Sequence, residues 1–109
     1  RHQAICEAFG GSIVYAPELM HGKQCVIKAD NGTRLFQGLP AELKVARYHS
    51  LAVDKNNIPE ELVVTAVDEK GVVMALQHKM NPVYGVQFHP ESIMTPYGKK
   101  LIDNFLKIV

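Results

Sequence analysis

The tripeptide His89-Pro90-Glu91 combines the two residue types best suited to proton transfer in this sequence. It follows an apolar run at 83–88, and Pro90 has no N–H with which to continue a central strand, so His89 is expected at a strand end. The Glu91 carboxylate can accept a hydrogen bond from one imidazole nitrogen, which fixes the tautomer and leaves the other nitrogen as a base. Taken alone, the tripeptide is more often a strand-end histidine beside a surface carboxylate than two members of a catalytic triad.

A triad also needs a nucleophile, and the thiols of this sequence are Cys6 and Cys25. Cys6 lies in an amphipathic helical pattern next to Glu7, whose charge raises a thiol pKa rather than lowering it. Cys25 lies within a strand pattern. Neither occupies a sharp strand-to-helix turn, where a nucleophile faces helix N–H groups, so both are expected to be packing residues. Two cysteines do not make a disulfide framework, and a reducing cytoplasm is therefore the expected location.

Two further polar clusters are ambiguous. The run Arg47-Tyr48-His49-Ser50 is expected at a strand end, where it is equally well a polar turn or a loop whose backbone binds a polar ligand. His49 and Ser50 are not expected to contact each other, because adjacent residues of a strand point to opposite faces. His21-Gly22-Lys23 is either a surface turn or a contact for a partner or an anion. No histidine spacing demands a metal, and neither a metal nor another cofactor is expected.

The elements that must position these residues follow from periodicity and turn residues. A helix is predicted at 2–9, ended by Gly10-Gly11, and a second near the C-terminus, capped by Thr95 with Pro96 in its first turn. Strands are predicted at 12–16, 24–29, 43–48, 62–67, 72–77 and 83–88, with a hairpin turn at 68–71. The chain is thus one α/β domain, residues 1–109, whose two helices cannot cover both faces of the sheet.

Composition narrows the class of partner. The 109 residues are 47% hydrophobic and 21% charged, with a net charge of +1, which gives no reason to expect nucleic acid or an anionic membrane as partner. No apolar run is long enough to span a bilayer. The chain begins with Arg1 rather than with a signal peptide or an initiator methionine, and we expect it to be processed or a fragment.

Five stretches together resemble one family, the class I glutamine amidotransferases, and within it the small subunits of anthranilate synthase and aminodeoxychorismate synthase. They are HQAI at 2–5, AFGG at 8–11, MHGK at 20–23, VARYHSL at 45–51 and GVQFHPES at 85–92, in the family's order. The resemblance covers this whole chain and a little more than the C-terminal half of the family domain. It implies part of a flavodoxin-like α/β domain with a mixed sheet and helices.

The resemblance also implies residue roles. In the family, a Cys-His-Glu triad hydrolyses glutamine to glutamate and ammonia, and the ammonia passes to a chorismate-using synthase subunit. His89 looks like the triad histidine and Glu91 like its orienting carboxylate. Gln3 matches the glutamine that follows the nucleophile and contacts bound substrate. Ser50 and Leu51 match the pair whose backbone holds the amino-acid end of the substrate.

The resemblance to the family breaks down at Arg1. The segment His21-Gly22-Lys23 resembles one near the synthase interface of the family. At the start of the chain, Arg1 stands where the family pattern Cys-x-Gly-His-Gln has glycine. The nucleophilic cysteine would stand two positions ahead of Arg1, so this chain alone is expected to be inactive. The rival hypothesis is a non-catalytic binding module that keeps the synthase-docking surface and that self-associates through an uncovered sheet face or edge.

Overall fold

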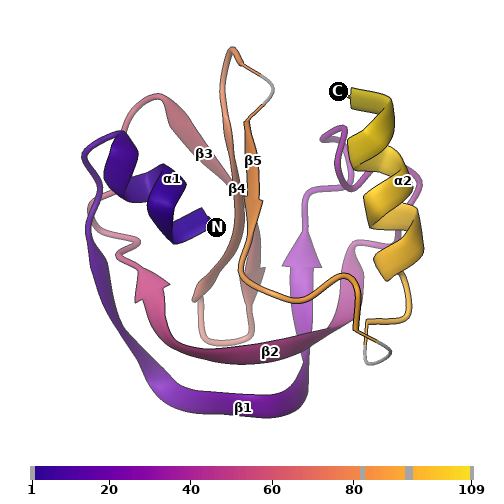
Figure 1. The fold of residues 1–109 in the computed structure, drawn as a ribbon, viewed down its shortest axis with the longest axis horizontal. Helices are drawn as coiled ribbons and strands as arrows, with labels where there is room; N and C mark the ends of the chain where they lie inside the picture. The colour runs from indigo at the N-terminus through magenta and orange to yellow at the C-terminus, as the bar shows by residue number, and fades with distance from the viewer. Residues whose placement is uncertain (1, 82, 93–94, 109) are drawn as a thin grey trace.

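The computed structural model describes residues 2–81, 83–92 and 95–108. The elements in chain order are α1 (His2–Ala8), β1 (Ile13–Ala29), β2 (Glu42–Val53), β3 (Leu62–Asp68), β4 (Val73–His78), β5 (Tyr84–Val86) and α2 (Gly98–Ile108). The strands form one sheet in the order β2-β1-β3-β4-β5 (Figure 1). The predicted α/β class is confirmed. Each of these neighbouring pairs is antiparallel.

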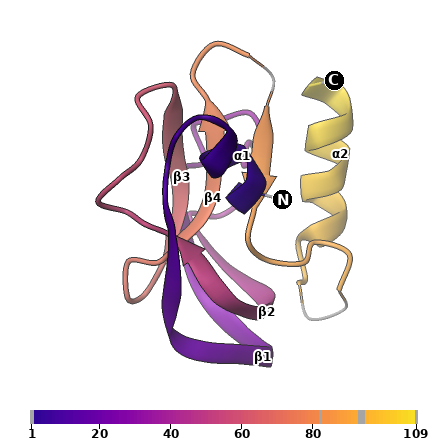
Figure 2. The same cartoon turned by 60° about the vertical axis from the view of Figure 1, so that its left-hand side comes forward.

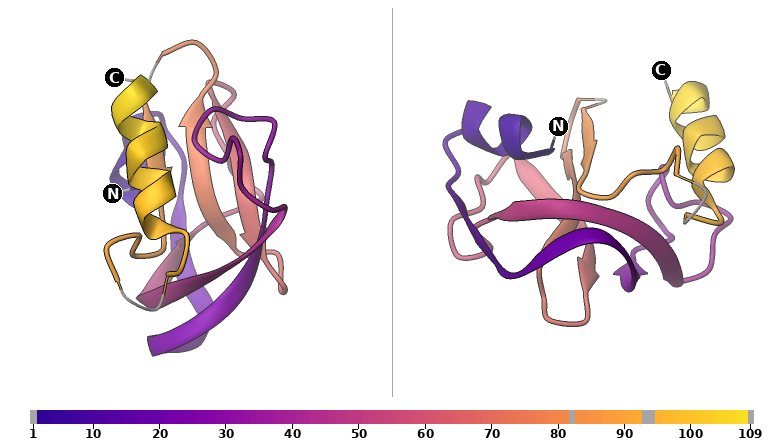
Figure 3. Two further views of the ribbon diagram at one scale, coloured as in Figure 1. Left: turned by 90° about the vertical axis from the view of Figure 1, so that its right-hand side faces the viewer. Right: turned by 60° about the horizontal axis from the view of Figure 1, so that its bottom comes forward.

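The first two strands form a long curved ribbon that runs beneath the rest of the domain (Figures 1 and 3). The separate strands predicted at 12–16 and 24–29 are one strand of 17 residues. Its pairing with β2 shifts register between Tyr15 and Met20 and again between His21 and Lys23. Of the two alternatives for His21-Gly22-Lys23, the surface turn is therefore wrong, because pairing with β2 continues past Gly22, which lies at a register irregularity.

The hairpin of β3 and β4 is confirmed. Its turn is closed by Asp68, whose Oδ1 accepts hydrogen bonds from the N–H groups of Lys70 at 2.9 Å and Val72 at 2.8 Å. Gly71 has φ of 81°, a conformation that glycine adopts without a steric penalty. The next strand, β5, has three residues rather than the predicted six, because beyond Gln87 the chain leaves β4 and crosses toward β2.

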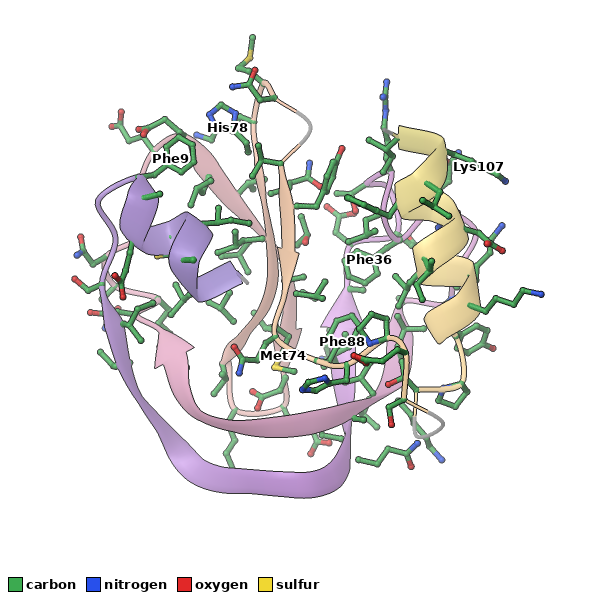
Figure 4. All side chains as sticks on the ribbon, in the orientation of Figure 1. Phe9, Phe36, Met74, His78, Phe88 and Lys107 are labelled. Atoms are coloured by element: carbon green, nitrogen blue, oxygen red, sulfur yellow. The ribbon has the colours of Figure 1, made fainter. Side chains whose placement is uncertain are left out.

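The two helices lie on opposite sides of the β4–β5 pair (Figures 1 and 2). On the α2 side, the buried core includes Phe36, Met74, Phe88 and Leu101. On the α1 side, a smaller core surrounds Cys6, and the rings of Phe9 and His78 lie 5.1 Å apart (Figure 4). The helix α1 contacts β5, β2 and β1, and its N-terminal end points toward β5 (Figures 1 and 2). The strand that precedes His89 therefore lies beside the start of α1.

The helix α2 begins at Gly98, three residues later than Thr95, the cap predicted from sequence. Its Asn104 is buried and donates from Nδ2 to the carbonyls of Leu35 at 2.8 Å and Gln37 at 2.9 Å, which fixes the loop between β1 and β2. Part of its apolar surface stays uncovered, with 39% of Ile102, 39% of Phe105 and 63% of Leu106 exposed. In the described part of the chain, no helix is long and apolar enough to cross a bilayer.

Candidate active site

His89, the predicted base, is in contact with Glu91, its predicted partner carboxylate. Nδ1 of His89 and Oε1 of Glu91 are 3.1 Å apart. An ionised carboxylate can only accept, so in the neutral imidazole the proton is on Nδ1 and Nε2 is the basic nitrogen. The His89 side chain is 45% exposed and that of Glu91 65% exposed, so the imidazole is within reach of a substrate. A histidine in this tautomer can accept a proton from a nucleophile.

The backbone of His89 is fastened to β2 at both of its polar groups. Its N–H donates to the carbonyl of Ala46 at 3.1 Å. Its carbonyl accepts from the hydroxyl of Thr95 at 2.7 Å, and the same hydroxyl accepts from the N–H of Ala46 at 3.0 Å. Sequence reasoning missed this arrangement. A threonine followed by Pro96 is typical of a helix cap, and no local signal indicates a hydroxyl partner 49 residues away.

Three backbone hydrogen bonds join described residues between His89 and the start of α2. The N–H of Ser92 donates to the carbonyl of His89 at 3.2 Å, the N–H of Thr95 to that of Ser92 at 3.0 Å, and the N–H of Gly98 to that of Thr95 at 2.9 Å. The first of these hydrogen bonds closes a turn that folds the Glu91 side chain back toward the imidazole. Gly98 lies so close to Pro90 that a Cβ built on Gly98 would overlap the Pro90 carbonyl oxygen.

The predicted substrate-binding pair, Ser50 and Leu51, lies a few residues beyond Ala46, the β2 residue that bonds to the backbone of His89. Ser50 and Leu51 lie within β2 rather than at a strand end, and Leu51 pairs with Tyr15. The segment 47–51 follows Ala46 directly, so the strand that anchors His89 also carries the predicted substrate-binding pair. The side chains of 47–51 lie outside the described residues, and their predicted roles stay predictions.

The other predicted contacts occupy two further elements. His21 pairs with Tyr48 and Lys23 with Arg47, so the predicted partner segment His21-Gly22-Lys23 runs alongside the start of 47–51. Gln3 is in the first turn of α1, the helix whose start lies beside β5. The side chains of Gln3 and of 21–23 lie outside the described residues. The segments 21–23 and 50–51 therefore lie on the β1–β2 ribbon, and Gln3 lies on α1, a helix that contacts both strands. The contacts of their side chains are untested.

Both thiols of the chain are in packed positions. Cys6 is fully buried, and burial, with the charges of Glu7 and Asp54 as smaller causes, raises the pKa of its thiol. Cys25 is half-buried in β1 and packs against the larger core. A nucleophilic cysteine needs exposure and a lowered pKa. Among the side chains that the structure describes, which leave out those of 2–3, 15–23 and 47–51, no group of three or more His, Cys, Asp or Glu could hold a metal ion.

The family model described as "Glutamine amidotransferase class-I" matches residues 2–109. The chain belongs to that family. It is 48% identical over 106 residues to the anthranilate synthase component II of Haloarcula marismortui, covering 95% of this chain and 55% of that protein. It is 47% identical to the aminodeoxychorismate/anthranilate synthase component 2 of Bacillus subtilis, covering 97% of this chain and 54% of that protein.

A solved structure has the same fold over nearly all of this chain. It is described as a putative GMP synthase protein from Thermoplasma acidophilum, and it aligns with a TM-score of 0.88 and 31% identity. The alignment covers 97% of this chain and 52% of that one. The chain thus spans about half the length of these two relatives, and 18% of the bifunctional protein TrpGD of Thermotoga maritima, to which it is 50% identical.

Proposed function

We propose that this chain is part of a glutaminase that hydrolyses glutamine to glutamate and supplies ammonia to a chorismate-using synthase subunit, for anthranilate or 4-amino-4-deoxychorismate synthesis. The observation that supports it most directly is the contact between Nδ1 of His89 and Oε1 of Glu91 on an exposed turn. The proposed pathway rests on relatives at 47–48% identity that are named for these synthases, against 31% for the GMP synthase protein. We also propose a cytoplasmic location, where Cys6 and Cys25 remain thiols.

The proposed mechanism uses a Cys-His-Glu triad. Nε2 of His89 takes the proton of the cysteine thiol, and the thiolate attacks the side-chain carboxamide of glutamine. The tetrahedral adduct collapses as His89 returns the proton to the leaving nitrogen, which departs as ammonia. Water, deprotonated by His89, then hydrolyses the thioester and releases glutamate. Glu91 keeps the proton on Nδ1 and stabilises the imidazolium that forms between these steps.

The thiol in this proposal is neither Cys6 nor Cys25, since Cys6 is buried with a raised thiol pKa and Cys25 packs in β1. The family pattern puts it two positions ahead of Arg1. The start of α1 lies beside β5 (Figure 2), and His89 follows the last residue of β5 by three positions, which supports a place near His89 for a cysteine just ahead of this helix. Gln3 would then contact the bound glutamine.

Substrate and partner contacts complete the proposal. The backbone of Ser50 and Leu51 holds the amino-acid end of glutamine, and His21-Gly22-Lys23 contacts the synthase subunit. The pairing of 21–23 with 47–48 supports this assignment, because it puts the proposed docking segment beside the proposed substrate segment.

The experiment compares two polypeptides in a glutaminase assay, residues 1–109 alone and the complete product of the gene with its synthase partner. We expect turnover by the complete product, retained when Cys6 and Cys25 are both replaced by alanine and lost in His89→Asn. Residues 1–109 alone should show no turnover, because histidine and glutamate without a thiolate form no acyl-enzyme. Turnover by residues 1–109 that survives replacement of both cysteines would refute the proposed triad.

One observation favours a second candidate, a non-catalytic binding module. A groove of about 220 Å³ between α2 and β5 is lined by apolar side chains that include Leu35, Tyr84 and Phe105. An uncovered apolar surface of this kind is typical of an interface, and it would let residues 1–109 self-associate or bind without catalysis. Binding of the synthase subunit by the complete product, with no glutaminase activity in the complex, would favour the module over the enzyme.

A further inference from the structure

We propose that Thr95 is a positioning residue for this reaction, whose hydroxyl sets the place of the His89 imidazole relative to the substrate segment of β2. The inference rests on the proposed function. It concerns a residue that touches neither substrate nor the reacting atoms and that acts through the backbone of His89.

The inference comes from a closed ring of hydrogen bonds. Both polar backbone groups of Ala46 are joined to both polar backbone groups of His89. One link is direct, from the N–H of His89 to the carbonyl of Ala46 at 3.1 Å. The other passes through the hydroxyl of Thr95, with lengths of 3.0 Å to the Ala46 nitrogen and 2.7 Å to the His89 oxygen. Two links fix both the distance and the orientation of the His89 backbone relative to Ala46, whereas a single link would let the His89 backbone rotate about it.

The ring is buried at Ala46 and Thr95, and its hydrogen bond to the His89 carbonyl is part-buried. Ala46 is fully buried, and Thr95 is 5% exposed. If the hydroxyl were removed, a solvent molecule would have little access to replace it. Because a hydroxyl donates one hydrogen bond and accepts others, it can join an N–H to a carbonyl, whereas valine has the same shape and can do neither.

The ring connects the base to the substrate segment along one strand. Residues 47–51 follow Ala46 without interruption in β2, and they include the proposed substrate-binding pair. A shift of His89 relative to Ala46 is therefore a shift of the base relative to the bound glutamine. Misplacement of a reacting group by about 1 Å can cost on the order of 100-fold in rate.

Thr95→Val, made in the complete gene product with its synthase partner, tests the inference. We expect kcat for glutamine hydrolysis to fall by about 10- to 100-fold. The KM for glutamine should change by less than about threefold, because the substrate segment itself is intact. Thr95→Ser keeps the hydroxyl and should restore most of kcat. The matched control is Thr65→Val, which removes the hydroxyl of another buried threonine, on β3.

A second measurement reads the ring directly and does not depend on turnover. Amide hydrogen exchange at Ala46 should accelerate by about 10-fold or more in Thr95→Val, because this N–H loses its acceptor, and should stay near the wild-type rate in Thr95→Ser. If Thr95→Val does not fold, Thr95→Cys replaces it, since a thiol is a weak donor and acceptor and should give an intermediate kcat.

Three outcomes overturn the inference: a kcat for Thr95→Val within twofold of wild type, an equal loss in Thr65→Val, or a loss that serine does not restore. The proposed function fails separately, if the wild-type product does not hydrolyse glutamine at all. In that case the exchange rate at Ala46 still decides whether the ring holds His89.

Discussion

Gly98 is the position at which a single added methyl group should disturb the candidate site most. It is the first residue of α2 and is buried. A Cβ built there overlaps the Pro90 carbonyl oxygen and stands 2.8 Å from the Pro90 carbonyl carbon. Pro90 separates His89 from Glu91, so any displacement of the Pro90 backbone also displaces the turn that carries these two residues. The perturbation is Gly98→Ala.

The expected size follows from the contact distances. Non-bonded carbons are best separated by about 3.5–4.0 Å, so the 2.8 Å approach requires the turn or the helix to retreat by about 0.7 Å or more. The obstacle is main chain, which cannot rotate away as a flexible side chain can. A displacement near 1 Å corresponds to about 100-fold in kcat, or roughly 2.7 kcal/mol of activation free energy. Alanine also favours helix over glycine by up to about 1 kcal/mol, which offsets part of any loss of stability.

The assay is kcat for glutamine hydrolysis by the complete gene product, with the free energy of unfolding measured beside it. Gly98→Ala should lose about 10- to 100-fold in kcat while it remains folded. Lys99→Ala, which changes the next residue, an exposed one, is the matched control and should stay within about twofold of wild type. A kcat for Gly98→Ala within threefold of wild type would show that the turn yields without displacing His89, and the reasoning would be refuted.

Three other changes test separate contacts. Glu91→Gln keeps the shape but can present an N–H to Nδ1 of His89, which selects the wrong tautomer; kcat should fall about 10-fold or more, while KM for glutamine changes little. Asn104→Leu leaves two loop carbonyls without their donor and should lower the free energy of unfolding by about 2–4 kcal/mol in urea titrations, whereas exposed Asp103→Ala should change it by under about 0.5 kcal/mol. Burial raises the pKa of the Cys6 thiol, so the folded state favours the protonated thiol more than the unfolded state does. The resulting contribution to stability is lost as the pH rises above 9.0, the ordinary pKa of a thiol. Cys6→Ala should flatten that alkaline decline, measured as urea midpoints from about pH 7 to 10 relative to wild type.

Local sequence patterns predicted the elements that local interactions determine. The helix predicted at 2–9 matches α1 because both of its signals are local: the apolar spacing lies within the helix and Gly10 follows it directly. Gly10 has the positive φ of 94° expected at a helix end. The hairpin at 68–71 matches because the side chain of Asp68 closes its own turn. The contact of His89 with Glu91 was predictable for the same reason, since the partners are two residues apart.

Pairing across long sequence separations was not predictable in this way. Gly22 reads as a turn, but the ribbon continues past it because β2 pairs with β1 on both sides of the glycine. Thr95 reads as a helix cap, but its hydroxyl bonds to Ala46, and no periodicity or spacing encodes a partner so distant in the chain. Local sequence therefore predicted the contact of His89 with Glu91 but not the hydrogen bonds that hold the His89 backbone in place.

The side-chain contact of His89 is exposed, whereas the hydrogen bonds of its backbone involve buried residues. The His89–Glu91 pair is 45% and 65% exposed, and contacts between exposed ionisable groups contribute only about 0–1 kcal/mol. Such a contact can choose a tautomer, but it is too weak to hold an imidazole in one place. The hydrogen bonds that fix the His89 backbone involve Ala46 and Thr95, which are buried and sheltered from competing water. In the proposed mechanism, Glu91 therefore orients the imidazole ring, whereas Thr95 and β2 fix its position, and loss of either contribution should lower kcat by a different physical route.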